Sequence, residues 1–453
     1  MFKESSSTSY WNEIEGKPWS EIEQLTNRKL QQQVHYLYEN SIFYQGKFKE
    51  AGVRPEHILE AKDLNKIPYT IKAEVRESLQ KEILGLHRAV PRDRVIQIQA
   101  TSGTTGKPAY VGATKHDVHV WSEMGARAMY ANGFRPGDWA VHAFSMSKGF
   151  VGGLVMVQIL QHMDVCEIPI GAEVGVAKML QMIQDLSPDA IVGTPNFIMY
   201  LGERCEDVLG IPARELSIRK ISVGGEPGGA IPAFRTKLEN LWGADVRDMM
   251  GGADFGSTYW GECEEKDGMH FCGQGYLLPQ LIHPESGEFL PIEPGVEGEL
   301  VYSAIDRQCS PLLKYRSSDL VRIIATSCSC GRTSFKIKSL GRSDDMLIVR
   351  GINVFPSAVK DCILQFQPMT TGQMRILVDF EGHSTQNPLH IKVEYAEGLE
   401  SSLLDGLKKE IELKMKAALA INTIVNFVPA GSLEPPGAQK VPLIERINTK
   451  EMK

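Results

Sequence analysis

The sequence predicts an α/β fold in which a large N-terminal domain precedes a small α+β C-terminal domain. Strands and helices alternate between residues 117 and 223, which is typical of a mainly parallel sheet with helices on both faces. Short β-type segments dominate beyond Gly273, and the pattern changes again at Gly341. The chain has 453 residues, of which 42% are hydrophobic, so it can bury more than one core. We therefore expect domains at residues 1–343 and 344–453.

The expected elements follow from the spacing of apolar residues, which repeats every three to four positions in helices and alternates in strands. The chain opens with a helix over residues 19–51 and a strand over 96–99. The alternating units that follow lie at residues 117–131, 139–144, 152–162, 165–168, 176–186, 190–192, 195–205 and 220–223. The β-rich part contains strands at 298–302 and 320–324, and the small domain contains segments at 374–380, 390–395, 401–418 and 424–428. Residues 401–418 form an amphipathic helix whose predicted core residues are Leu403, Leu404, Leu407, Ile411 and Met415.

Composition excludes some classes of function. The formal net charge is −7 and no block of Lys and Arg of useful length occurs, so a nucleic acid is not the expected partner. No run of about eighteen apolar residues is present, and the first residues lack the apolar core of a signal peptide. We therefore expect a cytoplasmic protein with no membrane partner.

The most informative segment is ATSGTTGKP at residues 100–108. Its glycines let backbone N–H groups turn toward an anion, and hydroxyl groups and a lysine add further donors. It is not the common P-loop, because only two residues separate its first glycine from the Gly-Lys pair and a proline follows. An ordinary surface turn rich in Ser, Thr and Gly is the alternative. The expected phosphate ligands are Thr101, Ser102, Gly103, Thr104, Thr105, Gly106 and Lys107.

Three further segments carry a resemblance to a known family. They are ISVGGEPGG at residues 221–229, YRSSDL at 315–320 and GRSDDMLIVRGINVFPS at 341–357. Together with the loop, they resemble the adenylate-forming superfamily, and in detail its phenylacetate–CoA ligase branch. The stretch YENSIFYQGKFKEAGV near the N-terminus is also similar to that branch, so the resemblance covers nearly the whole chain. It implies a large adenylate-forming domain with a mobile C-terminal lid.

The resemblance implies a reaction in two steps. An aromatic or related carboxylic acid first attacks the α-phosphate of ATP, with Mg²⁺ on the phosphates, and gives acyl-AMP and pyrophosphate. The thiol of CoA then displaces AMP. Charge accumulates on phosphate oxygens, so preorganised donors are required rather than a covalent nucleophile. A hinged lid can present different surfaces to the two steps. The resemblance also implies a homodimer.

The resemblance assigns roles to particular residues. The residues implied to lie against the adenine side of ATP are Gly225, Glu226, Pro227, Asp248, Met250 and Gly251. Asp319 presents two acceptors suited to the ribose diol, whereas an isolated Ser-Asp-Leu would normally be a solvated turn. Arg342 is implied to contact ATP and to act in catalysis, and Asp344 is implied to be the hinge between the domains.

Two places depart from the branch. In DMMGGAD at residues 248–254, Met250 replaces a tyrosine that stacks on adenine, and Asp254 replaces a glutamate that binds magnesium. Methionine can still contact a purine through its polarisable sulfur, and aspartate remains a hard oxygen ligand for magnesium. Near the C-terminus, PPGAQKVPLIER has no lysine directly after its glycine, so Lys440 is the candidate catalytic lysine. If Lys440 does not fill that role, adenylation is slow or the chain serves another acceptor.

Four soft ligands predict a zinc site: Cys263, His270, Cys328 and Cys330. Three thiolates and one imidazole suit a closed tetrahedral structural site, and Cys-x-Cys-Gly-Arg is a compact chelating turn. Buried cysteines acting as small hydrophobic residues are the alternative, and Cys272 is an alternative ligand to His270. The branch has similar segments at these places, which favours zinc with no open position for catalysis.

The acyl pocket is predicted from apolar and small residues near the nucleotide: Phe144, Met146, Phe150, Pro169, Gly171, Gly225, Gly251 and Gly252. Three functions remain open at this point. The first is an acid–CoA ligase. The second is a ligase that passes the adenylate to an amine or to the thiol of a carrier protein. The third is a nucleotide-binding regulator that keeps the fold without turnover.

Overall fold

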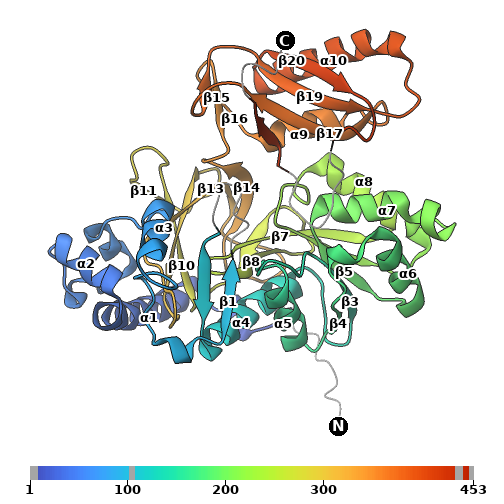
Figure 1. Cartoon of the computed structure of the whole chain (residues 1–453). Helices are drawn as coiled ribbons and strands as arrows, with labels where there is room; N and C mark the ends of the chain where they lie inside the picture. The colour runs from blue at the N-terminus through green and yellow to red at the C-terminus, as the bar shows by residue number, and fades with distance from the viewer. Residues whose placement is uncertain (1–8, 101–107, 434–441, 448–453) are drawn as a thin grey trace.

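Two bodies of unequal size make up the fold, with the smaller one stacked on top of the larger one in Figure 1. The computed structural model describes residues 9–100, 108–433 and 442–447. Strands up to residue 342 belong to the sheets of the larger body, and strands from residue 347 onward form two further sheets. Residues 347–444 supply a hydrophobic core that fills the smaller body. Each body therefore has a core of its own.

A mixed sheet of twelve strands runs through the larger body in the order β11-β10-β12-β13-β14-β9-β8-β7-β6-β5-β3-β4. Its parallel half consists of β3 (Trp139–Ala143), β4 (Cys166–Ile168), β5 (Ala190–Gly193), β6 (Lys220–Val223) and β7 (Asp245–Gly252). Its antiparallel half consists of β8 (Gly256–Glu262), β9 (Met269–Phe271), β10 (Leu277–Ile282), β11 (Phe289–Leu290), β12 (Glu297–Ala304), β13 (Tyr315–Ala325) and β14 (Lys336–Arg342).

Strand β7 joins the two halves of this sheet. Residues 245–248 pair with β6 in parallel, and residues 249–252 pair with β8 in antiparallel register. The predicted α/β class is confirmed. The predicted β-rich subdomain beyond Gly273 continues the same sheet, because β7 is long enough to carry both kinds of pairing.

Helices cover both faces of the parallel half. Along the strands, Ala140 and Val192 face one core while their neighbours Val141 and Ile191 face another, as the two-residue period of a strand requires. The first core is shared with α4 (Lys115–Ala131) and α5 (Leu154–His162). The second core is shared with α6 (Val176–Leu186), α7 (Pro195–Leu209) and α8 (Pro232–Trp242).

The N-terminal region differs from its prediction at one point. The expected single helix is divided into α1 (Trp19–Asn40) and α2 (Ile42–Glu50), because Ser41 is extended and the backbone N–H of Phe43 donates to the carbonyl of Leu86 at 3.1 Å. Further along lie α3 (Lys72–Lys81) and the antiparallel pair β1 (Gln97–Ala100) and β2 (Tyr110–Ala113).

The smaller body combines two sheets with two helices. Its strands are β15 (Leu347–Val349), β16 (Ile352–Val354), β17 (Thr370–Val378), β18 (Ser384–Thr385), β19 (Leu389–Tyr395), β20 (Thr423–Val428) and β21 (Ile444–Arg446), and its helices are α9 (Pro356–Leu364) and α10 (Ser401–Leu419). The predicted core face of α10 is correct for Leu407, Ile411 and Met415, which are buried. It is wrong for Leu403, which is 51% exposed in the first turn of α10. In the described part of the chain, no helix is both long and apolar enough to cross a membrane.

Candidate active site

The candidate site lies at the carboxyl ends of the parallel strands. Phe144 follows β3, Asn196 follows β5 and Gly225 follows β6, so all three come to the same edge of the sheet. In open α/β sheets, ligands bind in the crevice at this edge. The predicted adenine turn and one predicted wall of the acyl pocket therefore meet where a ligand is expected.

The turn after β6 is held by the start of α7. Gly225 has a φ of +84°, a conformation that side chains disfavour. The carboxylate of Glu226 accepts hydrogen bonds from the backbone N–H and the Nδ2 of Asn196, at 3.2 and 2.7 Å. Pro227 continues the turn. Gly225, Glu226 and Pro227 thus form a braced loop on the ligand edge.

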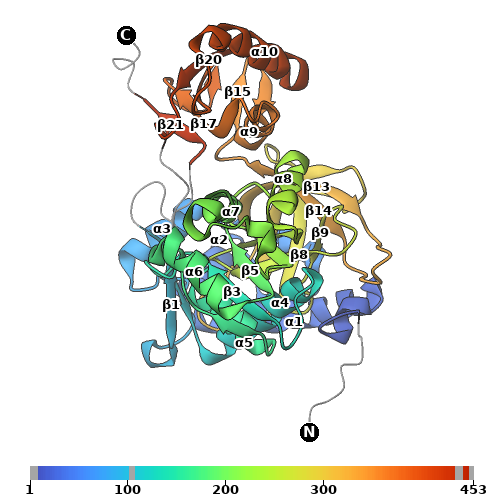
Figure 2. The same ribbon diagram turned by 90° about the vertical axis from the view of Figure 1, so that its right-hand side faces the viewer.

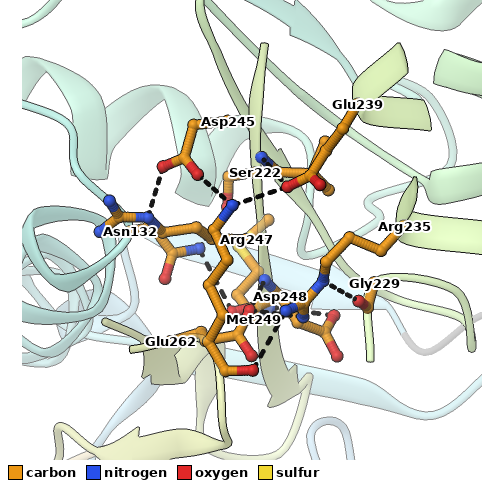
Figure 3. A network of polar contacts seen from close by, with 12 residues as sticks. Asn132, Ser222, Gly229, Arg235, Glu239, Asp245, Arg247, Asp248, Met249 and Glu262 are labelled. Carbon is orange, nitrogen blue, oxygen red and sulfur yellow. Dashed lines mark hydrogen bonds and ion pairs between the residues drawn. The ribbon is translucent and has the colours of Figure 1, made fainter. Parts of the chain in front are cut away.

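Asp248 lies beneath this turn. A side chain on Gly229 would place its Cβ 2.7 Å from the Oδ1 of Asp248. Figure 3 shows the surrounding network, in which Glu262 accepts hydrogen bonds from the backbone N–H of Asp248 at 3.0 Å and from Arg235 at 2.6 Å. Burial, with the charge of Glu262, raises the pKa of Asp248 to about 8, so its carboxyl group is protonated at neutral pH. Asp248 is placed to support the turn, and its contact with ATP stays a prediction.

Arg342 links the predicted ribose ligand to the predicted hinge. The register of β13 and β14 sets Asp319 opposite Arg342. Nη1 of Arg342 donates to Asp319 at 3.0 Å, while Nε and Nη2 donate to the two carboxylate oxygens of Asp344 at 2.7 and 2.8 Å. Burial would raise the pKa of Asp344, but these hydrogen bonds lower it below its usual range. One guanidinium group therefore connects the edge of the large sheet to the start of the small domain.

Asp254, the predicted magnesium ligand, lies close to this cluster. Burial raises the pKa of its carboxyl group, whereas a hydrogen bond with Tyr315 and the charges of Arg307 and Arg342 oppose that rise. Arg307 also donates to the backbone carbonyl of Asp254. Tyr315 begins β13, the strand that carries Asp319, so both predicted ligands depend on the position of one strand.

The predicted acyl-pocket residues come together in part. The rings of Phe144 and Phe150 are 6.1 Å apart between centroids, and a Cβ on Gly225 would lie 3.9 Å from the ring of Phe144. Gly171, with a φ of +72°, faces the side chain of Met146, because a Cβ there would lie 2.7 Å from its Cγ. These five residues therefore lie in three loops on the ligand edge, after β3, β4 and β6.

The glycines of the β7–β8 turn have a different role. A Cβ on Gly251 would lie 2.1 Å from the carbonyl oxygen of Ser257, so this glycine lets the two strands approach each other. A Cβ on Gly252 would lie 3.3 Å from the hydroxyl oxygen of Tyr259. Met250 is partly buried against the core of the large sheet. Whether these three residues contact ATP or the acid stays a prediction.

Two predicted parts of the site lie outside the described residues: the phosphate loop at 101–107 and the candidate catalytic residue Lys440. The residue before the loop, Ala100, donates its backbone N–H to the carbonyl of Gly149 at 2.7 Å and forms a β-bridge with Phe150. The loop therefore starts beside the predicted acyl pocket.

Three residues near the site received no role from the sequence. Asn196 could have been found, since it lies at the start of the predicted helix 195–205, which follows the predicted strand 190–192 at the ligand-binding edge. Tyr315 could also have been found, because it is the first residue of the YRSSDL motif. Arg307 lies in a stretch with no recognisable pattern, so only the fold reveals that it approaches Asp254.

The four predicted zinc ligands meet in one place. Their ligand atoms all lie within 4.8 Å of one another. The sulfurs of Cys263 and Cys328 are 3.7 Å apart, and the sulfur of Cys330 lies 3.4 Å from the Nε2 of His270. A tetrahedral zinc ion requires about 3.8 Å between two sulfur ligands and about 3.5 Å between sulfur and nitrogen. The donor set therefore fits zinc.

The surroundings of this Cys/His cluster also suit bound thiolates. Lys336 donates to the sulfur of Cys328 at 3.4 Å, and Arg332 donates to the sulfur of Cys330 at 3.7 Å. The other ring nitrogen of His270 lies 3.2 Å from the carbonyl oxygen of Ser334, which orients the ring. The alternative ligand Cys272 instead directs its thiol to the carbonyl of His270 at 3.4 Å.

Sequence comparison with known proteins identifies the family. The curated phenylacetate-coenzyme A ligase of Thermus thermophilus is 32% identical over 440 residues, which cover 93% of this chain and 96% of that ligase. The chain belongs to the phenylacetate–CoA ligase family. Residues 351–444 also match the family model of the AMP-binding enzyme C-terminal domain. The resemblance seen in the motifs is thereby confirmed.

This member of the phenylacetate–CoA ligase family also resembles solved structures. A 2-hydroxyisobutyryl-CoA ligase in the postadenylation state, in complex with R3-HIB-AMP, is 25% identical with a TM-score of 0.89, over 99% of this chain and 94% of that one. The same ligase in the thioesterification state, with 2-HIB-AMP and CoA, gives a TM-score of 0.71 at the same identity and coverage. The present structure therefore superposes better on the postadenylation form of that ligase than on its thioesterification form.

Proposed function

We propose that the chain is an AMP-forming acid–CoA ligase. It converts a carboxylic acid and ATP into acyl-AMP and pyrophosphate, and it then transfers the acyl group to CoA with release of AMP. The observation that carries this proposal is the bridge from Asp319 through Arg342 to Asp344, on the ligand edge of a phenylacetate–CoA ligase family fold. A ribose ligand and a hinge joined by one side chain suit an enzyme that moves a lid over a bound nucleotide.

In the first step, an oxygen of the substrate carboxylate attacks the α-phosphorus, and the bond to the bridging oxygen of pyrophosphate breaks. Asp319 accepts hydrogen bonds from the ribose hydroxyls, and the turn at residues 225–227 lies against adenine. The loop at 101–107 holds the β- and γ-phosphates, and Lys440 bridges the carboxylate and the α-phosphate. Asp254 would hold a magnesium ion, which would neutralise charge on the phosphates.

In the second step, the thiol of CoA attacks the acyl carbonyl and AMP leaves. The small domain, residues 344–453, turns about Asp344 relative to residues 1–343 to admit the thiol. Two features support this boundary: the last strand of the large sheet ends at Arg342, and the separate small core begins at Leu347. The two TM-scores given above support a change of domain arrangement between the steps.

The substrate class follows from the pocket and the relatives. The curated relatives are phenylacetate-coenzyme A ligases, and Phe144 and Phe150 offer an aromatic wall beside Gly225. A flat aromatic acid packs well against such a wall. An aromatic or related carboxylic acid is therefore the proposed substrate, with CoA as the acceptor.

Zinc in the Cys/His cluster has a structural role in this proposal. Cys263, His270, Cys328 and Cys330 fill all four tetrahedral positions, so none is left for a substrate. A bound zinc ion would tie the end of β8 and β9 to the loop between β13 and β14, the strand pair that presents Asp319 and Arg342. A cytoplasmic location and a homodimer stay predictions.

Pyrophosphate release tests the function. The chain is incubated with ATP, magnesium and a panel of aryl acids that includes phenylacetate, with and without CoA. We expect acid-dependent pyrophosphate, acyl-AMP that hydroxylamine traps as a hydroxamate, and a thioester only when CoA is added. Amines and a carrier-protein thiol offered in place of CoA should give no product. Pyrophosphate that does not depend on any acid would contradict the proposal.

A further inference from the structure

A buried lysine of the small domain reaches into the large one. Lys360 lies on α9, which packs against α8 below it in Figure 2. Its side chain is only 3% exposed. Its Nζ donates a hydrogen bond to the Oδ1 of Asn196 at 2.5 Å. An ammonium group so fully removed from water requires a specific reason, because desolvating a charge is costly.

The contact continues to the adenine turn. Asn196 accepts from Lys360 with its oxygen and donates to Glu226 with both its Nδ2 and its backbone N–H. The negative charge of Glu226 favours the protonated form of Lys360 and opposes the lowering of its pKa by burial. A lysine of the small domain, an amide and a carboxylate thus form one polar chain that ends on the turn proposed to hold adenine.

The groups around this chain shield it from water. A small pocket of about 30 Å³ adjoins the contact, and Lys360 and Asn196 are among the residues that line it. Leu364, one turn after Lys360, packs against the core that α7 and α8 share. The ring of Phe234 lies 5.5 Å from the Nζ of Lys360. In this arrangement, a hydrogen bond to Asn196 and the charge of Glu226 therefore replace the hydration that Lys360 loses.

We propose that Lys360 is a positioning residue that fixes the adenine turn and stabilises the adenylate-forming arrangement of the domains. The proposal rests on the proposed function. When the small domain turns toward the thioester-forming arrangement, Nζ must leave Asn196 and return to water. The polar chain Lys360–Asn196–Glu226 is then broken, and the turn loses its brace at the stage when AMP has to leave.

The test compares Lys360→Met with Lys237→Met in the full-length enzyme. Lys237 borders the same small cavity, but it pairs with Glu203 inside the large domain and is partly exposed, so it is a matched control. Lys360→Met should raise the KM for ATP in acyl-AMP formation about tenfold, because a hydrogen bond to a charged group is lost. The conversion of preformed acyl-AMP to thioester should be unchanged or faster. Lys360→Arg should recover most of the loss, and Lys237→Met should behave as wild type.

Hydrogen exchange provides a second readout that does not need activity. Backbone amides at residues 223–230 should exchange faster in Lys360→Met and in Asn196→Ala, without a further increase in the double variant. If the Lys360 variants fold but leave both the KM for ATP and this exchange unchanged, the positioning role is wrong while the ligase function stands. If the wild type forms no acyl-AMP with any acid but the exchange pattern is as expected, the ligase function fails and the contact stands.

Discussion

The Cys/His cluster and the nucleotide edge differ in how the fold assembles them. The cluster takes all four ligands from the large domain, with His270 on β9, Cys263 just after β8, and Cys328 and Cys330 in the loop between β13 and β14, and three of the four are buried. The nucleotide edge takes Glu226 and Asp319 from the large domain, Lys360 from the small domain, and Arg342 and Asp344 from the junction between them. The first site is complete within one rigid unit, whereas the second is complete only in one arrangement of two units.

Metal coordination within one domain and hydrogen bonds between two domains suit different purposes. A closed metal site stabilises the sheet continuously, because breaking it means unfolding that region. Hydrogen bonds across a domain boundary are individually weak enough to be exchanged during each catalytic cycle. Changes in the cluster should therefore affect stability, and changes at the nucleotide edge should affect rates.

The largest effect is expected for Cys330→Ser. Loss of one thiolate should release zinc and lower the free energy of unfolding by several kcal/mol, on the order of a lost structural metal ligand. Metal content per chain and calorimetric unfolding measure the two effects. Cys166→Ser, at an exposed cysteine outside the cluster, is the control. A wild-type protein that binds no zinc would contradict the claim that the Cys/His cluster is a structural metal site.

The next largest effect is expected for Asp319→Ala. The ribose hydroxyls lose a charged acceptor, so kcat/KM for ATP should fall about thirtyfold, or about 2 kcal/mol. The unfolding temperature should change little, because Asp319 is not part of a core. Steady-state kinetics with varied ATP measures this, and Glu297→Gln, in an exposed pair on the neighbouring strand, is the control. An unchanged KM for ATP would place the ribose elsewhere.

A smaller effect, about tenfold in kcat/KM for ATP, is expected for Arg342→Gln. Glutamine cannot bridge Asp319 and Asp344, so the two carboxylates lose their shared partner. Because the hinge is involved, both half-reactions should slow, in contrast to Lys360→Met, which should slow only the first. Single-turnover measurements of each half-reaction distinguish the two variants. Slowing of the first half-reaction alone would argue against a role at the hinge.

The smallest effect on rates is expected for Asp248→Asn, which should instead change how stability depends on pH. Burial raises the pKa of Asp248 from 3.8 to about 8, so between these values the folded chain retains a proton that the unfolded chain has released. The free energy of unfolding of the wild type should therefore fall as pH rises from about 5 to about 8. Asparagine cannot release a proton, so the variant should show little of this fall, which amounts to about 1.4 kcal/mol for each pH unit between the two pKa values. Denaturant titrations at several pH values measure the free energy of unfolding of both proteins. The same pH dependence in wild type and variant would contradict a raised pKa for Asp248.

The sequence predicted the parts of the molecule that local patterns determine. Strand β6 and helix α6 have the expected bounds, and the four members of the Cys/His cluster were predicted from residue type together with the family resemblance. It did not predict contacts between distant segments. Nothing around Lys360 distinguishes it from a solvated helix lysine, and its burial depends on how α9 meets α7 and α8. Asp248 was predicted from a motif, but its position beneath the turn depends on the neighbouring Glu262 and Arg235.

A crystal structure with a non-hydrolysable acyl-AMP analogue tests the central claim most directly. We expect the ribose hydroxyls on Asp319, the adenine against residues 225–227 and the acyl group beside Phe144, with Lys360 still bonded to Asn196. An analogue bound away from Asp319 and this turn would contradict the account, because the nucleotide would then not lie where the two domains meet.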